Sequence, residues 1–260
     1  MNDEPSKIRI DFAAYGIPAG RYSLPGLADA RRIADGTAAD EIRIADRFTR
    51  HFTGDLTVAD LTPAEFQLIR DDFHEQVADR REQTQQQYRN QVPHRFAAAT
   101  PDNAANAWAK QVVTDLHSAR SLVLCGPVGT GKTHYAWSAL RALADTGARI
   151  TWRATTEADM FAQLRPGGAA DAEGEIEKLA SVGVLLIDDL GAAKNSEWTE
   201  EVTYRIVNRR YEECRPSIFT TNVHPDHFTT TLGARIASRL AQMCDVVEVK
   251  GADRRKGDGQ

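Results

Sequence analysis

The stretch Gly126-Pro127-Val128-Gly129-Thr130-Gly131-Lys132-Thr133 governs how the rest of this chain is interpreted. It has the pattern G-x-x-x-x-G-K-T and stands between a short apolar run and a segment of helical composition. A glycine-rich loop between a strand and a helix turns its backbone N–H groups toward phosphate oxygens, and the new helix adds its positive end. We therefore predict a loop that binds the phosphates of a nucleotide.

Two side chains of this loop have the chemistry that a nucleoside triphosphate requires. The ammonium of Lys132 can reach the β- and γ-phosphate oxygens, and the hydroxyl of Thr133 can ligate Mg²⁺. A chance match to a glycine-rich turn is the competing interpretation, and the flanking strand and helix disfavour it. The expected ATP-binding residues are the loop and the histidine after it: Gly126, Pro127, Val128, Gly129, Thr130, Gly131, Lys132, Thr133 and His134.

Two carboxylates follow the apolar run 184–187, which reads as a strand buried on both faces. Ligands of parallel sheets gather outside the carboxyl ends of the strands, so Asp188 and Asp189 should lie beside the phosphate loop. We assign Asp188 to Mg²⁺, mostly through water, and Asp189 to the general base that polarises the attacking water. Away from a phosphate loop, the same pair would indicate a solvated turn.

Other polar residues extend this predicted site. Asn222 follows the predicted strand 217–221 and could orient water against the γ-phosphate, although Thr-Thr-Asn is also typical of a turn. Arg235 and Arg239 are four residues apart and share one helix face. Either could neutralise charge on the transferred phosphoryl group of a neighbouring subunit, or form surface ion pairs. Past the last strand, Arg254 or Arg255 could contact phosphate or belong to a solvated tail.

Composition indicates a globular protein. The chain has 260 residues, 27% charged and 42% hydrophobic, with a net charge of −5, so nucleic-acid contacts require local basic patches. Its three cysteines lie far apart and suggest neither a disulfide framework nor a zinc site, which favours a reducing cytoplasm. No run approaches the roughly 20 apolar residues of a membrane span, and the first residues do not resemble a signal peptide.

Strand and helix patterns alternate in the second half of the chain. This alternation predicts an α/β fold with a parallel five-stranded sheet covered by helices. We divide the chain into a mostly helical N-terminal partner-binding region (1–85), a linker (86–100) and an ATPase domain (101–260). The expected strands are 122–125, 149–153, 183–188, 217–221 and 246–249, and the expected helices lie near 132–145, 157–164, 173–180, 197–213 and 231–240.

Arginines and aromatic residues cluster around the second predicted strand and the fourth helix. This mixture could line a channel for single-stranded DNA through backbone charge and base stacking. The competing interpretation is a pair of solvated charged faces, with Trp152 in the core. The residues are Arg149, Arg153, Arg165, Arg205, Arg209, Arg210 and Arg215, with Trp152, Phe161 and Tyr211 among them.

Residues 91–255 resemble the DnaC/DnaI/IstB-like branch of the AAA+ ATPases, which are P-loop proteins. The resemblance is carried by the phosphate loop and by the segments 93–96, 186–191, 206–211, 220–222 and 233–240. It implies a Mg²⁺-dependent ATPase that releases ADP and phosphate, with subunits that associate side by side and share ATP sites. It also implies that Asn222 is the first sensor, Arg239 the arginine finger with Arg235 as second choice, and Arg255 the second sensor.

From this resemblance we expect a helicase loader of DNA replication. Its N-terminal region would dock on a replicative hexameric helicase, and the ATPase would handle single-stranded DNA. One alternative is an IstB-like transposition ATPase that binds a transposase and duplex DNA. A P-loop kinase for small molecules is more remote, because the arginines cluster after the Thr-Thr-Asn segment rather than in a mobile lid. Intact Lys132, Asp188 and Asp189 disfavour an adaptor with a purely structural nucleotide.

Overall fold

The structure, a computed structural model, describes residues 78–165, 171–193 and 196–250. The chain clusters into two compact units, Met1–Arg80 and Arg81–Gln260. The N-terminal helices that the sequence suggests before residue 78 lie outside the described residues, as does Arg255. The second unit contains the phosphate loop and is the part described below.

Five parallel strands form one sheet in the order β2-β3-β4-β1-β5, which confirms the predicted architecture. Strand β4 lies between β1 and β3, so the carboxyl ends of these three strands are neighbours. This order brings the segments that follow them in sequence to one edge of the sheet. The strands are β1 (Ser121–Cys125), β2 (Trp152–Thr156), β3 (Val184–Asp188), β4 (Ser217–Thr221) and β5 (Cys244–Glu248).

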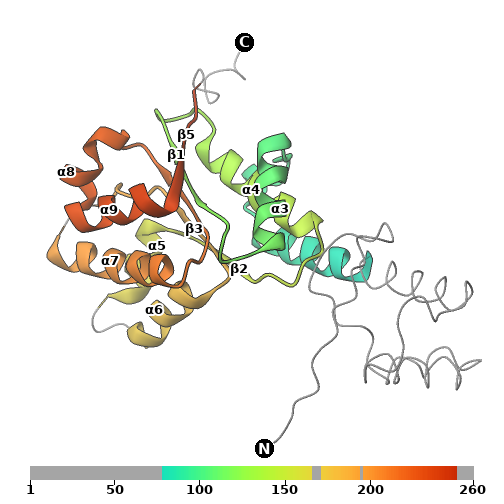
Figure 1. Ribbon diagram of the computed structural model, residues 1–260, viewed down its shortest axis with the longest axis horizontal. Helices are drawn as coiled ribbons and strands as arrows, with labels where there is room; N and C mark the ends of the chain where they lie inside the picture. Colours follow the sequence, from blue (N-terminus) through green and yellow to red (C-terminus); the bar gives the residue numbers. More distant parts are fainter. Residues whose placement is uncertain (1–77, 166–170, 194–195, 251–260) are drawn as a thin grey trace, which may run out of the picture. The chain divides into compact units, whose positions relative to one another are not determined.

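Helices cover both faces of the sheet (Figure 1). Helices α3 (Asn103–Thr114) and α4 (Lys132–Asp145) pack on one face. The other face carries a separate core and five helices of the described part of the chain. These helices are α5 (Glu157–Leu164), α6 (Ala172–Ser181), α7 (Glu197–Glu212), α8 (Phe228–Leu232) and α9 (Ala234–Met243). The structure also describes two short 3₁₀ helices, η4 (His94–Phe96) and η5 (Pro225–His227).

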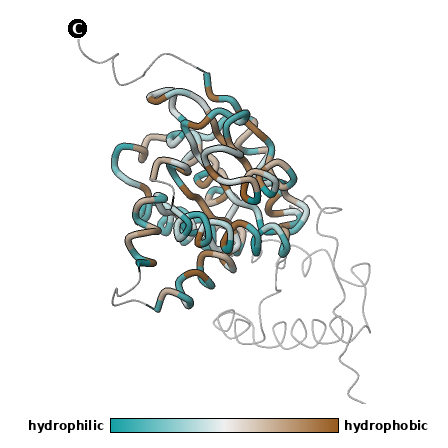
Figure 2. The backbone as a smooth tube through the Cα atoms, turned by 90° about the vertical axis from the view of Figure 1, so that its left-hand side faces the viewer, coloured by the Kyte–Doolittle hydropathy of each residue, from teal (hydrophilic) through white to brown (hydrophobic). Residues whose placement is uncertain are grey.

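The side chains of β1 show why the strands of this sheet have mostly apolar sequences. Leu122 and Leu124 pack into the core under α3 and α4, whereas Val123 and Cys125 pack into the core on the opposite face. A strand buried on both faces has no position for a solvated side chain. The helices, by contrast, alternate between hydrophilic and hydrophobic residues (Figure 2), because each has one face in a core and one in water.

Three predicted elements differ from the structure. The second strand begins at Trp152 rather than at residue 149, because Trp152 is the residue that pairs with Val184. The last strand begins two residues earlier than expected, where Cys244 pairs with Ser121. The helix expected near 231–240 is interrupted at Gly233, whose φ of 94° no α-helix can contain, and the chain forms α8 and α9 instead.

The expected linker is packed onto the unit that contains the phosphate loop. Residues 78–91 are helical, and Thr84 Oγ1 donates to the carbonyl of Ala144 at 2.6 Å. Tyr88 is buried, with its ring edge-on to Trp137. Residues 86–100 therefore contribute to the core around α4 instead of spanning open solvent. That residues 1–85 form a partner-binding region stays a prediction.

Candidate nucleotide-binding and hydrolysis site

The phosphate loop leaves β1 in a conformation that requires glycine. Gly126 has a φ of 146°, and a Cβ at this position would lie 2.5 Å from the carbonyl oxygen of Val249. Gly129 and Gly131 also have positive φ, and Gly131 is the last residue before α4. The chain therefore turns tightly enough for the loop to lie at the positive end of α4, where backbone N–H groups attract phosphate.

Lys132 lies inside the loop with 5% of its surface exposed. Its Nζ donates to the carbonyls of Gly126 (2.9 Å) and Pro127 (2.8 Å) and to Oδ1 of Asn222 (2.7 Å). The predicted lysine and asparagine are thus in direct contact, although 90 residues separate them. Phosphate oxygens are also hydrogen-bond acceptors, so those of a bound nucleotide could take the place of these oxygens as partners of Nζ.

Asp188 lies beside the hydroxyl of Thr133, which donates to Asp188 Oδ1 at 2.9 Å. Burial raises the pKa of the Asp188 carboxyl, and hydrogen bonds from Thr220 and Thr133 oppose the increase. A partly buried carboxylate next to a hydroxyl is a set of hard oxygen donors that suits Mg²⁺. Thr133 and Asp188 would hold this ion, which supplies positive charge against the phosphate oxygens when bound.

Asp189 follows the end of β3 and is exposed at the same edge of the sheet. Its φ of 57° is unusual for a residue with a side chain. Its backbone N–H donates to the hydroxyl of Thr220 at 2.9 Å, and Leu190 N–H donates to the Thr220 carbonyl at 2.8 Å. The backbone of Asp189 is therefore held in place by β4, while its carboxylate stays accessible to water.

Thr220 is a functional residue that our sequence interpretation did not single out. It is fully buried, donates to Asp188 Oδ1 at 2.5 Å and accepts from the backbone of Asp189. A single hydroxyl therefore joins both acidic residues to β4, the strand that leads to Asn222. The sequence feature that could have indicated Thr220 is a hydroxyl side chain inside a strand at the centre of the sheet, because a buried hydroxyl needs a hydrogen-bond partner.

Glu157 is a second residue that the sequence interpretation missed. It begins α5 directly after β2, and only 4% of its surface is exposed. Its carboxylate accepts from the backbone of Gly191 (3.1 Å) and Ala193 (2.9 Å) in the turn that follows Asp189. Burial raises the pKa of the Glu157 carboxyl, and these backbone hydrogen bonds oppose the increase. Glu157 thus holds the turn from the side of β2.

Replacing Glu157 with alanine is expected to lower ATP turnover about tenfold without weakening nucleotide binding, because buried N–H groups left unsatisfied cost about 1–3 kcal/mol. The turn after Asp189 would then relax, whereas the phosphate loop would keep its contacts. Turnover and the affinity for a fluorescent ATP analogue should be measured for Glu157→Ala and for the exposed control Glu177→Gln. Equal losses in both variants would contradict this role.

The two predicted finger residues contact α7. Arg239 donates through Nε to Oδ1 of Asn208 at 2.9 Å and lies over the ring of Tyr211. Arg235 lies over the ring of Tyr204, with its guanidinium carbon 3.5 Å from the ring centre. Their role toward a neighbouring subunit stays a prediction.

Most of the arginines that could line a channel for single-stranded DNA contact other residues of their own subunit. Arg153, Arg205 and Arg209 form ion pairs with the α6 residues Glu175, Glu173 and Glu177. Trp152 and Phe161 are buried in the cores and cannot stack on bases. The three arginines therefore form an internally neutralised surface with α6 rather than an open basic channel.

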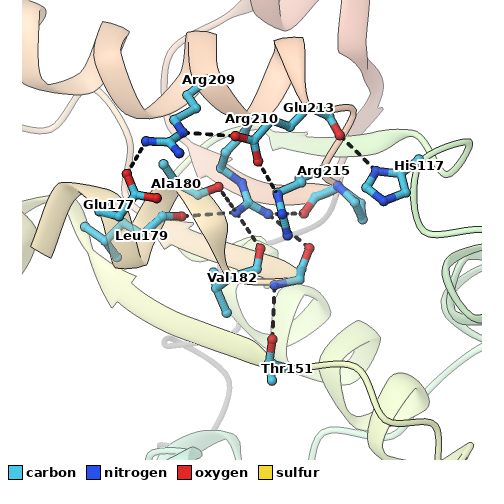
Figure 3. Close-up of polar contacts among 12 residues, drawn as sticks. His117, Thr151, Glu177, Leu179, Ala180, Val182, Arg209, Arg210, Glu213 and Arg215 are labelled. Atoms are coloured by element: carbon cyan, nitrogen blue, oxygen red, sulfur yellow. Dashed lines mark hydrogen bonds and ion pairs between the residues drawn. The ribbon is translucent and has the colours of Figure 1, made fainter. Parts of the chain in front are cut away.

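Arg210 differs most from its expected place (Figure 3). Its side chain is fully buried and donates to the hydroxyl of Ser217 and to five backbone carbonyls. Burial lowers the pKa of its guanidinium to about 9, so it remains charged at neutral pH. It ties the end of α6 to the starts of β3 and β4, and its carbonyl partners belong to Leu179, Ala180, Val182, Gly183 and Pro216.

Two absences can be stated for the part of the chain that the structure describes. It contains no group of three or more His, Cys, Asp or Glu side chains that could hold a metal ion. Among the helices that the structure describes, none combines the length and the apolar composition needed to cross a bilayer.

A phosphate loop after β1, paired acids after β3 and an asparagine after β4 define a P-loop nucleotide-binding protein of the AAA+ class. The family model described as IstB-like ATP binding protein matches residues 68–259. The chain belongs to this family, as the resemblance to the DnaC/DnaI/IstB-like branch predicted.

Individual relatives have different roles. The replicative helicase loader DnaC of Escherichia coli is 28% identical over 123 residues, 46% of this chain and 49% of the loader. An ATP-binding protein in an insertion sequence of Mycobacterium tuberculosis is 29% identical over 114 residues, 44% of this chain and 45% of that protein. The chain thus spans about half the length of these curated relatives.

Solved structures agree on the fold. The crystal structure of DnaI superimposes with a TM-score of 0.53 at 23% identity and covers 63% of this chain and 94% of that chain. At this identity the likeness concerns the arrangement of strands and helices.

Proposed function

We propose that this protein hydrolyses ATP to ADP and phosphate. The observation that carries the proposal is the convergence of three strand ends: Lys132 after β1 contacts Asn222 after β4, and Thr133 contacts Asp188 at the end of β3. These are the groups that position a triphosphate, a metal ion and a water molecule.

In the proposed reaction the oxygen of a water molecule attacks the γ-phosphorus. Asp189 accepts the proton of that water, and Asn222 orients the water from the neighbouring strand. The bond between the γ-phosphorus and the β–γ bridging oxygen breaks, so ADP leaves with that oxygen. Lys132 neutralises negative charge on the phosphates as it shifts to the leaving oxygen.

Replacing Asp189 with asparagine should lower ATP turnover by about 10²–10³-fold, because general-base catalysis contributes at least this much. The amide has the same shape but cannot take up the proton, so nucleotide binding should persist. Phosphate release should be measured without any acceptor substrate, and ATP affinity in parallel. Full turnover in Asp189→Asn would exclude the assigned base, and turnover that appears only with a small-molecule acceptor would indicate a kinase.

For the biological role, we propose a loader that delivers a replicative helicase to single-stranded DNA. The similarity to the DnaC loader supports this role, as does an N-terminal unit that clusters apart from the ATPase. The second candidate is an ATPase that works with a transposase on duplex DNA. The IstB-like family model and the insertion-sequence relative favour that candidate.

Binding of the full chain to the two possible partners should separate these roles. We expect the full chain with ATP to co-elute with the replicative helicase of its own genome and not with an insertion-sequence transposase. Fluorescence anisotropy with single-stranded and duplex oligonucleotides of equal length, each over a salt series, provides the second measurement. Co-elution with the transposase and preference for the duplex would replace the loader by the transposition ATPase.

A further inference from the structure

Arg239 is held by two residues of α7. Its Nε donates to Oδ1 of Asn208 at 2.9 Å, and its guanidinium carbon lies 4.4 Å from the centre of the Tyr211 ring. Stacking on an aromatic face and one hydrogen bond together restrict both the position and the plane of a guanidinium. Arg239 is half-buried.

The two holding residues are themselves fixed. The hydroxyl of Tyr211 donates to Oε1 of Gln242 at 2.7 Å, and Gln242 Nε2 donates back to the hydroxyl of Ser238 at 3.1 Å. The amide nitrogen of Asn208 donates to Glu212 at 2.9 Å, which turns its oxygen toward Arg239. The contact between α7 and α9 therefore has a defined geometry and is more than a loose surface pair.

The terminal amino groups of the Arg239 guanidinium are the donors suited to binding a phosphate. Within the described part of the chain, Arg239 forms a hydrogen bond through Nε alone, so the two terminal amino groups of its guanidinium have no hydrogen-bond acceptor among the described residues. Two parallel N–H groups of this kind can bind a phosphate in a bidentate manner. Arg210 is the contrast, because it uses its whole fork within the subunit, on Ser217 and five carbonyls.

Arg235 provides a matched comparison on the same two helices. Its guanidinium stacks on Tyr204, but in the described residues no hydrogen bond fixes the plane of its fork, and its side chain is exposed. Stacking alone leaves the guanidinium free to turn about the ring normal. The structure therefore distinguishes two arginines that the sequence pattern treats alike.

We infer that Tyr211 and Asn208 are positioning residues that hold the fork of Arg239 ready for the phosphates in the ATP site of a neighbouring subunit. This inference rests on the proposed ATPase and adds the means by which one arginine is selected and oriented. Preorganisation helps because a free arginine side chain loses much rotational freedom when it is fixed at a phosphate.

The test uses mixtures of subunits, because a finger acts on the site of its neighbour. Tyr211→Leu alone is expected to lower ATP turnover about tenfold, since a stacked guanidinium contributes about 1–2 kcal/mol. Mixing it with Lys132→Ala should raise the turnover per subunit above that of either variant alone. The Lys132→Ala subunit has a disabled nucleotide site but an intact Tyr211–Arg239 pair, and the Tyr211→Leu subunit has the reverse.

About a quarter of the sites in a random one-to-one mixture combine both intact halves, because each neighbour is drawn with equal chance. The parallel mixture of Arg239→Ala with Lys132→Ala tests the shared site itself. Tyr211→Phe, which keeps the ring, should retain most of the turnover, and Tyr204→Leu should retain it as well. Asn208→Ala provides an independent variant if Tyr211→Leu unfolds, and thermal unfolding of each variant identifies such a failure.

The outcomes distinguish a wrong role for Tyr211 and Asn208 from the absence of a shared ATP site. If Arg239→Ala is rescued by Lys132→Ala but Tyr211→Leu and Asn208→Ala are not, the two residues act within their own subunit and the inference is wrong while the ATPase stands. A loss in Tyr204→Leu with none in Tyr211→Leu would move the finger to Arg235 and also overturn the inference. If no mixture restores activity, the shared ATP site fails, and the inference fails with it.

Discussion

Replacing Arg239 with alanine is expected to lower the ATP turnover of the assembled protein about a thousandfold or more, because an arginine finger contributes about 10³–10⁵ in rate. Its charge would be missing from the neighbouring site, where negative charge develops on the transferred phosphoryl group. Nucleotide affinity should change little, since the phosphate loop of each subunit remains intact. Steady-state turnover and equilibrium binding of an ATP analogue are the two measurements.

The dependence on protein concentration provides a check on this prediction. Turnover per subunit of the unaltered protein should rise with concentration as subunits associate, and that of Arg239→Ala should stay flat. Arg239→Lys keeps the charge but not the planar fork, so it should recover only a small part of the activity. Arg235→Ala is the matched control on the same helix, and turnover near that of the unaltered protein is expected. Full turnover in Arg239→Ala would rule out a finger at this position.

Replacing Arg210 with methionine is expected to destabilise the protein by more than about 4 kcal/mol, because several buried acceptors would lose their donor at about 1–3 kcal/mol each. Methionine has similar bulk, so the loss reports on hydrogen bonding more than on an empty cavity. The carbonyls concerned end α6 and precede β3 and β4, which carry Asp188, Asp189 and Asn222. The free energy of unfolding from urea denaturation measures the effect.

Arg205→Met is the control for this second prediction. Arg205 lies on the same helix and pairs with Glu173 at the surface, where an ion pair contributes at most about 1 kcal/mol. A similar loss in both variants would contradict the role of Arg210 as a buried link between α6, β3 and β4. Should Arg210→Met fail to fold in cells, Arg210→Lys, which keeps a cation with fewer donors, should fold with intermediate stability.

The parallel sheet and much of the site could be predicted because their signals are local. A strand buried on both faces must be apolar throughout, and a polar residue directly after it lies at the carboxyl edge of the sheet. This reasoning placed Asp188 and Asn222 near the phosphate loop, where they now contact Thr133 and Lys132. The starts of β2 and β5 were shifted because strand register depends on the partner strand.

Residues that act through distant partners could not be recognised in this way. Thr220 and Glu157 look like an ordinary strand residue and an ordinary helix start, and their roles appear only where β3 and its turn lie between them. Likewise, the sequence of an arginine-rich helix does not show whether its arginines face solvent, glutamates or carbonyls. The sequence left open whether the arginines of α7 line a DNA channel or form a solvated charged face, and in the structure Arg205 and Arg209 pair with glutamates of α6.

The sequence by itself determined which atoms could do the chemistry: the spacing of glycines, lysine and threonine in one loop, and the acids that end an apolar strand. Those properties depend on neighbours along the chain. Only the tertiary structure decided what each arginine does, because its partners are supplied by other elements, such as Ser217 and five carbonyls for Arg210 and the Tyr211 ring for Arg239. A guanidinium is long and has five donors, so its role is set by whatever the fold places around it.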